Sequence, residues 1–302
     1  MLVSCSLKRQ RRSAKMMLVE EGKIDLDDKI TKYIANLPVD WNLITIRHLL
    51  THTSSIVNYA SMPEIWERFL YPVSKSEMIN LIAGHPLVFQ PGENYLYGNN
   101  NYFLLAMIVE QASGKSFNDF VTERIFSPLS MKETRFNDYH RLIMNRASGY
   151  ELTNQLQNVQ HRDPSWSLGA GDLISTTLDL AKWDAALYTE RLLTRKSLAQ
   201  MWQPMVLNDG SSIPYGFGWG TGMLNNHRIV WHAGGTEGFR SFIARFIEDR
   251  VTVIVLINEI PAPVEELAIN IANFYIDGLL ANNTNINKEL NLDLDKEELL
   301  LR

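Results

Sequence analysis

Apolar residues recur at helical spacing through the first two thirds of the chain and at strand spacing near its end. The pattern predicts a helix over residues 13–21 that stops at Gly22, because a left-handed glycine commonly ends a helix. Three further segments combine helical spacing with a capping residue, and each predicts a helix: 46–51 after Thr45, 100–113 before Gly114, and 178–188 behind the pair Thr176 and Asp179.

The period changes after about residue 212. Residues 241–247 alternate apolar and polar, residues 251–257 form a nearly continuous β-branched run, and a polar turn separates the two segments. A last helix is expected from Pro263 to about Leu280. The pattern therefore predicts an α/β (α+β) fold in which an antiparallel sheet is flanked by helices.

Composition is ordinary for a globular protein of one large or two moderate domains, with 302 residues, 45% hydrophobic and 21% charged. The net charge of −5 does not predict nucleic-acid binding, and the single cysteine excludes an internal disulfide framework and a thiolate metal cluster. No apolar run approaches the length of a membrane span. The partner that these features leave is a small-molecule or peptide substrate.

Two short motifs suggest chemistry. The stretch 231–239 reads Trp-His-Ala-Gly-Gly-Thr-Glu-Gly-Phe, and the stretch Tyr97-Gly98-Asn99 lies upstream of it. A tyrosine beside an asparagine can supply a base and a substrate hydrogen bond, while a glycine-rich turn brings backbone N–H groups to a developing oxyanion. The pair predicts a serine acyl-transferase site, although the sequence contains no Ser-x-x-Lys.

From about Met17 to Leu280 the chain resembles the serine β-lactamase-related hydrolases, which join class C β-lactamases, D-alanyl peptidases and small esterases. The resemblance rests on an ordered series of segments: 18–23, 26–28, 46–54, 89–92, 97–99, 169–176, 215–219 and 231–239. It implies a β-lactamase/transpeptidase-like architecture, in which a largely helical domain is inserted before the sheet and the active site lies between them. No metal and no organic cofactor is implied.

In that family a Ser-x-x-Lys precedes the Val-Glu-Glu-Gly stretch at a fixed distance, which places the pair at Cys5 and Lys8. On a helix, residues three apart share a face, and nearby cations favour the thiolate. The alternative starts from the basic run 8–15, because five cations in eight residues cannot be buried unpaired in the helix that the family buries. On that interpretation residues 1 to about 15 are foreign to the fold, through truncation or a misread start.

The resemblance also implies roles for the other site residues. Tyr97 would be the base, Asn99 would donate to the substrate carbonyl, Gly234 would let the strand approach the substrate, and the Gly235 N–H would be the second oxyanion donor. Their structural alternatives are a packed tyrosine and an asparagine that caps a helix. His232 stands where many relatives have the lysine of Lys-Thr-Gly; because histidine is mostly neutral at pH 7, we expect weak β-lactamase activity.

Four segments are predicted. They are a remnant catalytic helix with a suspect N-terminal arm (1–23), a mainly helical domain (24–205), the sheet with its closing helix (206–280) and a flexible tail (281–302). The family sheet also takes two strands from upstream of the catalytic helix, so we expect an unpaired, aggregation-prone sheet edge here.

Two function classes stay open: an acyl-enzyme hydrolase of an ester, amide or D-alanyl peptide, and a non-catalytic family member whose site only binds. As written, the chain predicts a soluble cytoplasmic protein, while a start upstream of Met1 would leave room for an export signal. The oligomeric state cannot be read from the sequence. His48 and His52 have the spacing of a zinc helix, but the glutamate that a metalloprotease needs is missing, so we interpret them as structural.

Overall fold

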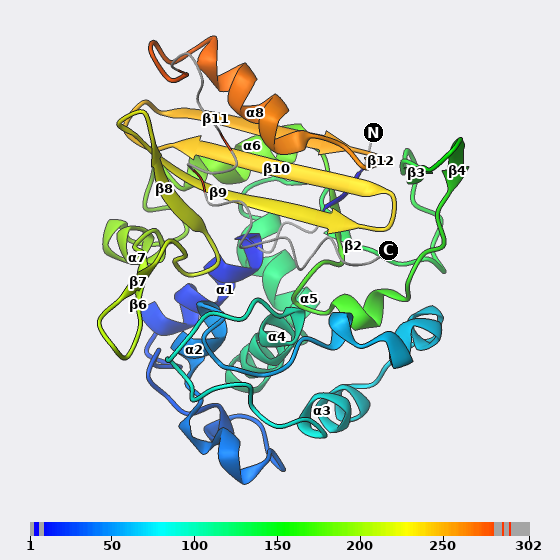
Figure 1. Cartoon of the computed structure of the whole chain (residues 1–302), viewed down its shortest axis with the longest axis vertical. Helices are drawn as coiled ribbons and strands as arrows, with labels where there is room; N and C mark the ends of the chain where they lie inside the picture. Colours follow the sequence, from blue (N-terminus) through cyan, green and yellow to red (C-terminus); the bar gives the residue numbers. More distant parts are fainter. Residues whose placement is uncertain (1–2, 6–8, 281–285, 287–289, 291–302) are drawn as a thin grey trace.

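A four-stranded antiparallel sheet with helices against both faces organises the structure (Figure 1). The structure, a computed structural model, describes residues 3–5, 9–280, 286 and 290, and side chains from residue 13 onward. The strands run in the spatial order β11-β10-β9-β8. Their bounds are β8 Gly220–Leu224, β9 His227–Thr236, β10 Phe239–Phe246 and β11 Val251–Ile257. The predicted antiparallel sheet and the hairpin around residues 247–250 are confirmed.

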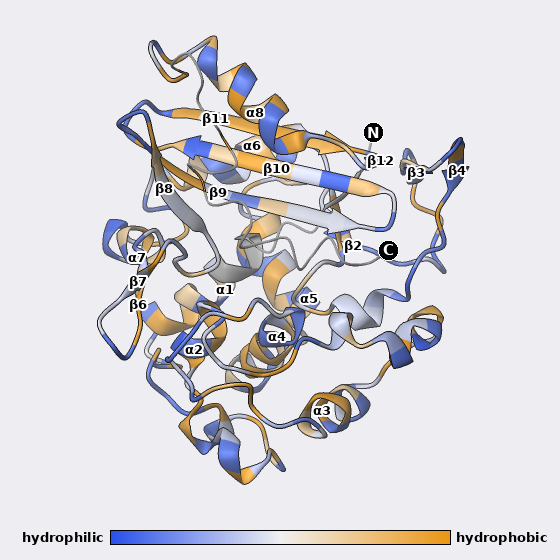
Figure 2. Cartoon of the chain, in the orientation of Figure 1, coloured by the Kyte–Doolittle hydropathy of each residue, from blue (hydrophilic) through white to orange (hydrophobic). Residues whose placement is uncertain are grey.

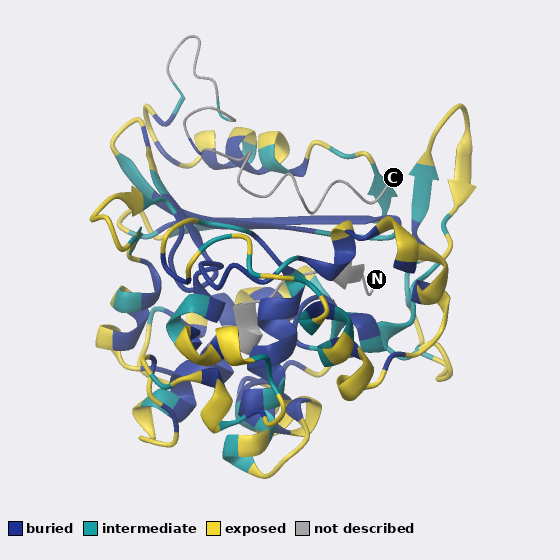
Figure 3. Ribbon diagram, turned by 60° about the horizontal axis from the view of Figure 1, so that its bottom comes forward, coloured by how far each residue is buried: buried dark blue, intermediate teal, exposed yellow. Residues whose placement is uncertain are grey.

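Each face of the sheet belongs to a different apolar core, because side chains alternate between faces along a strand. Trp231 and Phe242 pack with the closing helix α8 (Val264–Asn273), whereas Val230 and Ile243 pack into the large core of the helical part. Figure 3 shows the buried sheet between these layers. Helix α8 starts directly after Pro263 as predicted, but it ends before Leu280; the next residues form turns that leave Phe274 86% exposed.

Helices make up most of the second layer, and the helices predicted around residues 13–21, 46–51, 100–113 and 178–188 are confirmed within a few residues. The α-helices are α1 Arg9–Glu20, α2 Ile46–Leu50, α3 Lys75–Ala83, α4 Asn99–Ser113, α5 Phe117–Val121, α6 Thr177–Ala186 and α7 Arg195–Met201. Helix α4 is buried along most of its length and contacts α1, α2 and α5. Figure 2 shows its many hydrophobic residues at the centre of this layer.

Short helical turns and small sheets complete the fold. The 3-10 turns are η1 Ile30–Lys32, η2 Val39–Leu43, η3 Tyr59–Ser61, η4 Pro63–Leu70 and η6 Pro164–Ser167, and η5 Thr122–Phe126 is a π-turn. The small strands are β1 Val3–Cys5, β2 Arg135–Phe136, β3 Tyr150–Leu152, β4 Leu156–Asn158, β5 Leu173–Ser175, β6 Met205–Val206, β7 Ser212–Ile213 and β12 Glu259–Ile260. The segment 24–205 thus contributes strands as well as helices, and its status as a domain stays a prediction.

Strand β11 forms one edge of the four-stranded sheet. Among the described residues, β11 pairs with β10 alone, and self-association through its other edge stays a prediction.

The predicted tail 281–302 lies outside the described residues apart from Ile286 and Leu290, and Leu290 is buried in the core beneath α8. None of the helices described is both long and apolar enough to span a membrane.

Candidate active site

The turn Tyr97-Gly98-Asn99 is fastened to the segment that follows α2. Three backbone hydrogen bonds join the two stretches: Val88 N–H to the Ser55 carbonyl at 3.1 Å, Gly92 N–H to the Thr53 carbonyl at 2.9 Å, and Leu96 N–H to the His52 carbonyl at 2.9 Å. The loop before α4 is therefore paired along its length with residues 52–55, and it delivers Tyr97 to a defined place.

His52 holds this turn from behind. Its backbone is left-handed, with φ 57°, and its side chain is fully buried. Its Nδ1 accepts the Gly98 N–H at 3.2 Å and lies 3.1 Å from Nδ2 of Asn101, whose Oδ1 in turn accepts the Ser54 hydroxyl. Because a backbone N–H can only donate, Nδ1 carries no proton and the neutral imidazole carries its proton on Nε2.

Four tyrosine rings surround the His52 imidazole. Tyr97 is nearest, with ring centroids 4.3 Å apart, followed by Tyr102 at 5.3 Å, Tyr215 at 5.4 Å and Tyr95 at 6.0 Å. Tyr97 is only 1% exposed, so its ring is fixed by packing as well as by its chain neighbours. Sequence reasoning treated His52 as a structural histidine and missed that it packs against the candidate base.

Asn99 does not cap α4. The capping position is Gly98, which has no side chain to offer, and Asn99 is the first helical residue. The capping alternative for Asn99 is therefore wrong, and its side chain is partly exposed. Its backbone N–H donates to Oδ1 of Asn58 at 3.2 Å. A Cβ at position 98 would come within 2.7 Å of Oδ1 of Asn100, so a larger residue there would displace the Asn100 side chain.

The second motif lies on β9, beyond the end of β8. His232 pairs with Ile243 across the hairpin and is fully buried on the face toward the helical part, and Gly234 shares that face by alternation. Strand β8 begins at Gly220, opposite Trp231, so within the described part the stretch from His232 to Thr236 pairs with β10 alone. Hydrogen-bonding direction alternates along an antiparallel strand, and the two-residue turn joins Thr236 to Phe239, so the Gly235 N–H points away from β10.

Cys5 lies in a strand and not on a helix. The structure pairs Cys5 with Leu173 across β1 and β5, and α1 begins only at Arg9. The expectation that Cys5 and Lys8 share a helical face is thus wrong for Cys5, because pairing with the buried strand β5 keeps its backbone extended. Lys8 is outside the described residues. Strand β1 contacts β9, so the strand that contains Cys5 lies beside the strand that contains His232.

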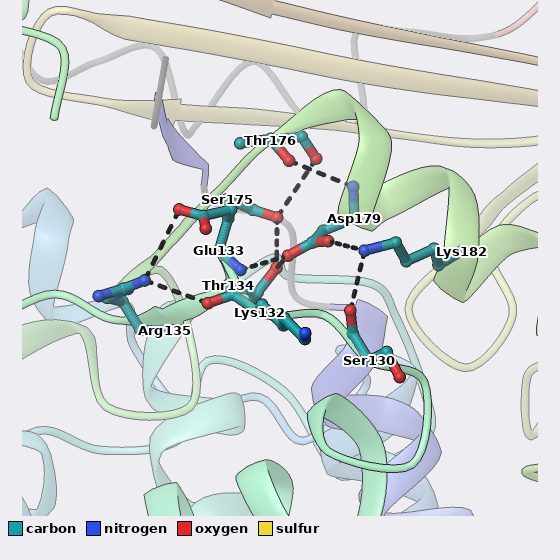
Figure 4. A network of polar contacts seen from close by, with 9 residues as sticks. All are labelled: Ser130, Lys132, Glu133, Thr134, Arg135, Ser175, Thr176, Asp179 and Lys182. Carbon is teal, nitrogen blue, oxygen red and sulfur yellow. Dashed lines mark hydrogen bonds and ion pairs between the residues drawn. The ribbon is translucent and has the colours of Figure 1, made fainter. Parts of the chain in front are cut away.

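A polar network with a buried carboxylate holds β5, the strand that pairs with Cys5 (Figure 4). One Asp179 carboxylate oxygen accepts the Glu133 N–H at 2.8 Å and the Thr134 hydroxyl at 3.1 Å, and the other pairs with Lys182. The Thr134 and Ser175 hydroxyls are 2.7 Å apart. Loop, strand and helix α6 are thereby joined at one carboxylate.

The basic run near the start of α1 enters the core at its last residue. Lys15 is fully buried, and its ammonium lies 4.8 Å from the ring centroid of Phe117 and 5.4 Å from that of Tyr102. Such cation–π contacts offset part of the cost of burying a charge. Helix α1 therefore accommodates one of the cations that sequence reasoning assigned to a foreign arm, while the origin of that arm stays a prediction.

His48 and His52 serve different backbone groups. His48 completes the capping box of α2, where its Nδ1 accepts the Thr45 N–H at 3.2 Å, and His52 accepts from Gly98. This agrees with their interpretation as structural residues. No group of three potential metal ligands was found among the residues that the structure describes. A cavity of about 770 Å³ along residues 135–143 contains none of the predicted site residues.

Comparison with solved structures defines the class of fold. The octameric penicillin-binding protein homologue from Pyrococcus abyssi matches with a TM-score of 0.81 at 25% identity, over 96% of this chain and 68% of that one. A D-amino acid amidase from Ochrobactrum anthropi SV3, complexed with D-phenylalanine, matches with a TM-score of 0.74 at 25% identity, over 91% and 82%. The α/β fold is that of penicillin-binding proteins, as the motifs predicted.

Sequence comparison gives the family. The model described as Beta-lactamase matches residues 14–275, so the chain belongs to the beta-lactamase family, and the predicted resemblance is confirmed. A penicillin-binding protein of Bacillus subtilis (strain 168) is 32% identical over 265 residues, which cover 81% of this chain and 57% of that protein. The chain thus spans little more than half the length of this relative.

Proposed function

We propose that this chain is a hydrolase that acts through an acyl-enzyme on an amide, ester or D-alanyl peptide. The observation that carries the proposal is the packing of His52 against Tyr97 and the Gly98 N–H, together with a His232–Thr236 stretch of β9 that, among the described strands, pairs with β10. A fixed phenol and a backbone N–H directed away from its hairpin are the parts that acyl transfer needs. The family supports the same chemistry, and the amidase relative supports amides of D-amino acids as substrates.

The proposed reaction uses the only thiol of the chain. Tyr97, as phenolate, takes the Cys5 proton while sulfur attacks the substrate carbonyl carbon, and the carbonyl oxygen gains the negative charge beside the Gly235 N–H. Collapse breaks the bond to the leaving amine or alcohol, which receives the proton from Tyr97. Water then attacks the thioester, and Tyr97 carries its proton to the departing sulfur. Asn99 orients the substrate amide.

A non-catalytic binding module is the second candidate. It is favoured by the position of Cys5 in β1, apart from α1, and by the missing Ser-x-x-Lys. In this case the same surface holds an amide or peptide without turning it over.

Intact-mass spectrometry after exposure to a penicillin and to an activated ester separates the two candidates. A hydrolase gives an adduct that peptide mapping places on Cys5, and the adduct is lost in Tyr97→Phe and in Cys5→Ala, with both variants folded by circular dichroism. Absence of any adduct in the parent chain supports the binding module. Because His232 replaces a permanent cation, penicillin turnover should be slow even when the ester acylates; fast penicillin turnover contradicts that expectation.

A further inference from the structure

A second, smaller cavity lies where the helical part meets the tip of the β9–β10 hairpin. It has a volume of about 300 Å³, and its walls come from three separate segments. Trp66, Phe69 and Leu70 of η4 form the apolar wall, His161 and Arg162 belong to the loop before η6, and Glu237 belongs to the hairpin turn. A cavity of about 150 Å³ already accepts benzene, so an aromatic side chain fits this one by volume.

The cavity includes one residue of the second motif and is connected to the first motif through η3 and η4. Glu237 is two residues beyond Gly235, so the two Cα atoms are at most roughly 7 Å apart, the length of two residues of extended chain. On the other wall, Asn58 accepts the Asn99 N–H and caps η3, the turn that leads directly into η4. A substrate held between Asn99 and Gly235 would therefore have this cavity within reach of its next side chain.

The two charged residues of the cavity wall, Arg162 and Glu237, form an ion pair with each other. Nη2 of Arg162 lies 2.5 Å from Oε1 of Glu237 and its Nε donates to the same oxygen at 2.7 Å, and the Arg162 side chain is 10% exposed. Burial lowers the pKa of His161, so the imidazole is neutral at pH 7. The guanidinium also lies over the Phe69 ring, 4.6 Å from its centroid. A charged ligand group would have to compete with a formed ion pair, whereas a neutral ring would not.

Two side chains of the apolar wall are partly exposed to solvent. Ile65 is buried in the core and the cavity-lining Phe69 is only 7% exposed, but Trp66 is 42% exposed and Leu70 43% exposed on the same 3-10 helix. Covering these side chains removes apolar surface from water, which favours binding of an apolar group. We propose that this cavity is a specificity subsite that takes an uncharged aromatic side chain of the substrate, next to the scissile bond. The proposal rests on the proposed function for the location of that bond.

Binding without turnover tests the subsite. Isothermal titration calorimetry compares N-acetyl-D-phenylalanine amide with N-acetyl-D-alanine amide on the parent chain, on Trp66→Ala and on Leu70→Ala, each carrying Cys5→Ala so that the probes are not hydrolysed. We expect the aromatic probe to bind at least about tenfold more tightly to the parent chain, and both substitutions to remove most of that preference while the affinity for the alanine probe stays the same. Phe274→Ala is the matched control, since it removes an exposed aromatic ring on the α8 side of the sheet, and it should keep the full preference.

Equal affinity of the parent chain for the two probes, or binding of neither, overturns the subsite. So does a preference that survives in both Trp66→Ala and Leu70→Ala, provided that both variants melt as the parent does. Failure of the proposed function looks different, because the parent chain would then show the aromatic preference but form no acyl adduct. An adduct without the preference leaves the hydrolase standing and removes the subsite.

Discussion

The imidazole of His52 lies against the ring of Tyr97, with centroids 4.3 Å apart, while its Nδ1 accepts the N–H of the next residue, Gly98. One side chain thus fixes both the ring of the candidate base and the backbone that carries it. A left-handed backbone at His52 aims the imidazole at this turn, a conformation that Asn also tolerates and that Ala adopts at a cost.

His52→Ala should lower the free energy of unfolding by about 3 kcal/mol, because it removes a buried ring, leaves the Gly98 N–H without its acceptor and strains the backbone. His52→Asn should lose less, since it keeps the left-handed backbone. Urea unfolding measures both. The control is His140→Ala at an exposed position, which should change stability by less than about 0.5 kcal/mol. Equal losses for His52→Ala and the control would remove His52 from its supporting role.

Much of the fold was readable from sequence because its signals are local. The Thr45 cap, the left-handed Gly114 and the alternating residues of β10 act within a few residues of one another, and each element formed where its signal stood. Helix α8 is the exception at its C-terminus, where the chain turns at Phe274 despite a continuing apolar pattern.

The site was less readable because its contacts are not local. Cys5 is extended because it pairs with Leu173, far along the chain, and helical spacing cannot register that pairing. His52 meets Tyr97 only after residues 52–55 and 88–98 pair through their backbones. The ordered motifs predict Tyr97, Asn99 and Gly235 as site residues, but the groups that contact Tyr97 and Gly98 come from tertiary structure that the motifs do not encode.

The carboxylate of Asp179 should contribute far more to the free energy of unfolding than the side chain of Lys182, with which it forms an ion pair. Asp179 is 2% exposed and accepts from Glu133 N–H and the Thr134 hydroxyl, so Asp179→Ala leaves buried donors unpaired and should cost about 3 kcal/mol. The Lys182 side chain is 45% exposed, so Lys182→Ala should lower the free energy of unfolding by less than about 1 kcal/mol. Guanidinium unfolding of the two variants compares them directly. Similar losses would mean that the ion pair, and not the buried acceptor, supports β5.

A buried ion pair joins the sheet to α6. Nε of Arg245 donates to the Asp184 carboxylate, and the guanidinium lies 4.8 Å from the Tyr188 ring centroid and 5.0 Å from that of Trp202. Arg245 is fully buried, so Asp184→Ala strands its charge and should cost about 3 to 5 kcal/mol. The double variant Asp184→Ala with Arg245→Met should be more stable than Asp184→Ala alone. A double-mutant cycle of unfolding free energies measures this, and simple additivity would contradict it.

His48 should make the protein less stable in mild acid. Burial, helped by the charges of Lys29 and Arg47, lowers the pKa of His48 from 6.5 to about 4. Between these pH values the His48 side chain binds a proton in the unfolded chain but not in the folded chain. Its contribution to the free energy of unfolding is therefore fully present above pH 6.5 and is lost as the pH falls toward 4. Allowing for partial exposure of the ring, the loss is about 1 to 2 kcal/mol.

His48→Gln isolates this contribution. Glutamine at this position of a capping box can still accept the Thr45 N–H, but it does not titrate. The variant should match the parent chain in unfolding free energy at pH 7.5 and exceed it by about 1 kcal/mol or more at pH 4.5, because carboxylates that titrate in the same range act on both proteins equally. Urea titrations at a series of pH values between these limits give the difference curve. A difference that stays flat with pH would show that the folded protein accepts the His48 proton as readily as the unfolded chain does.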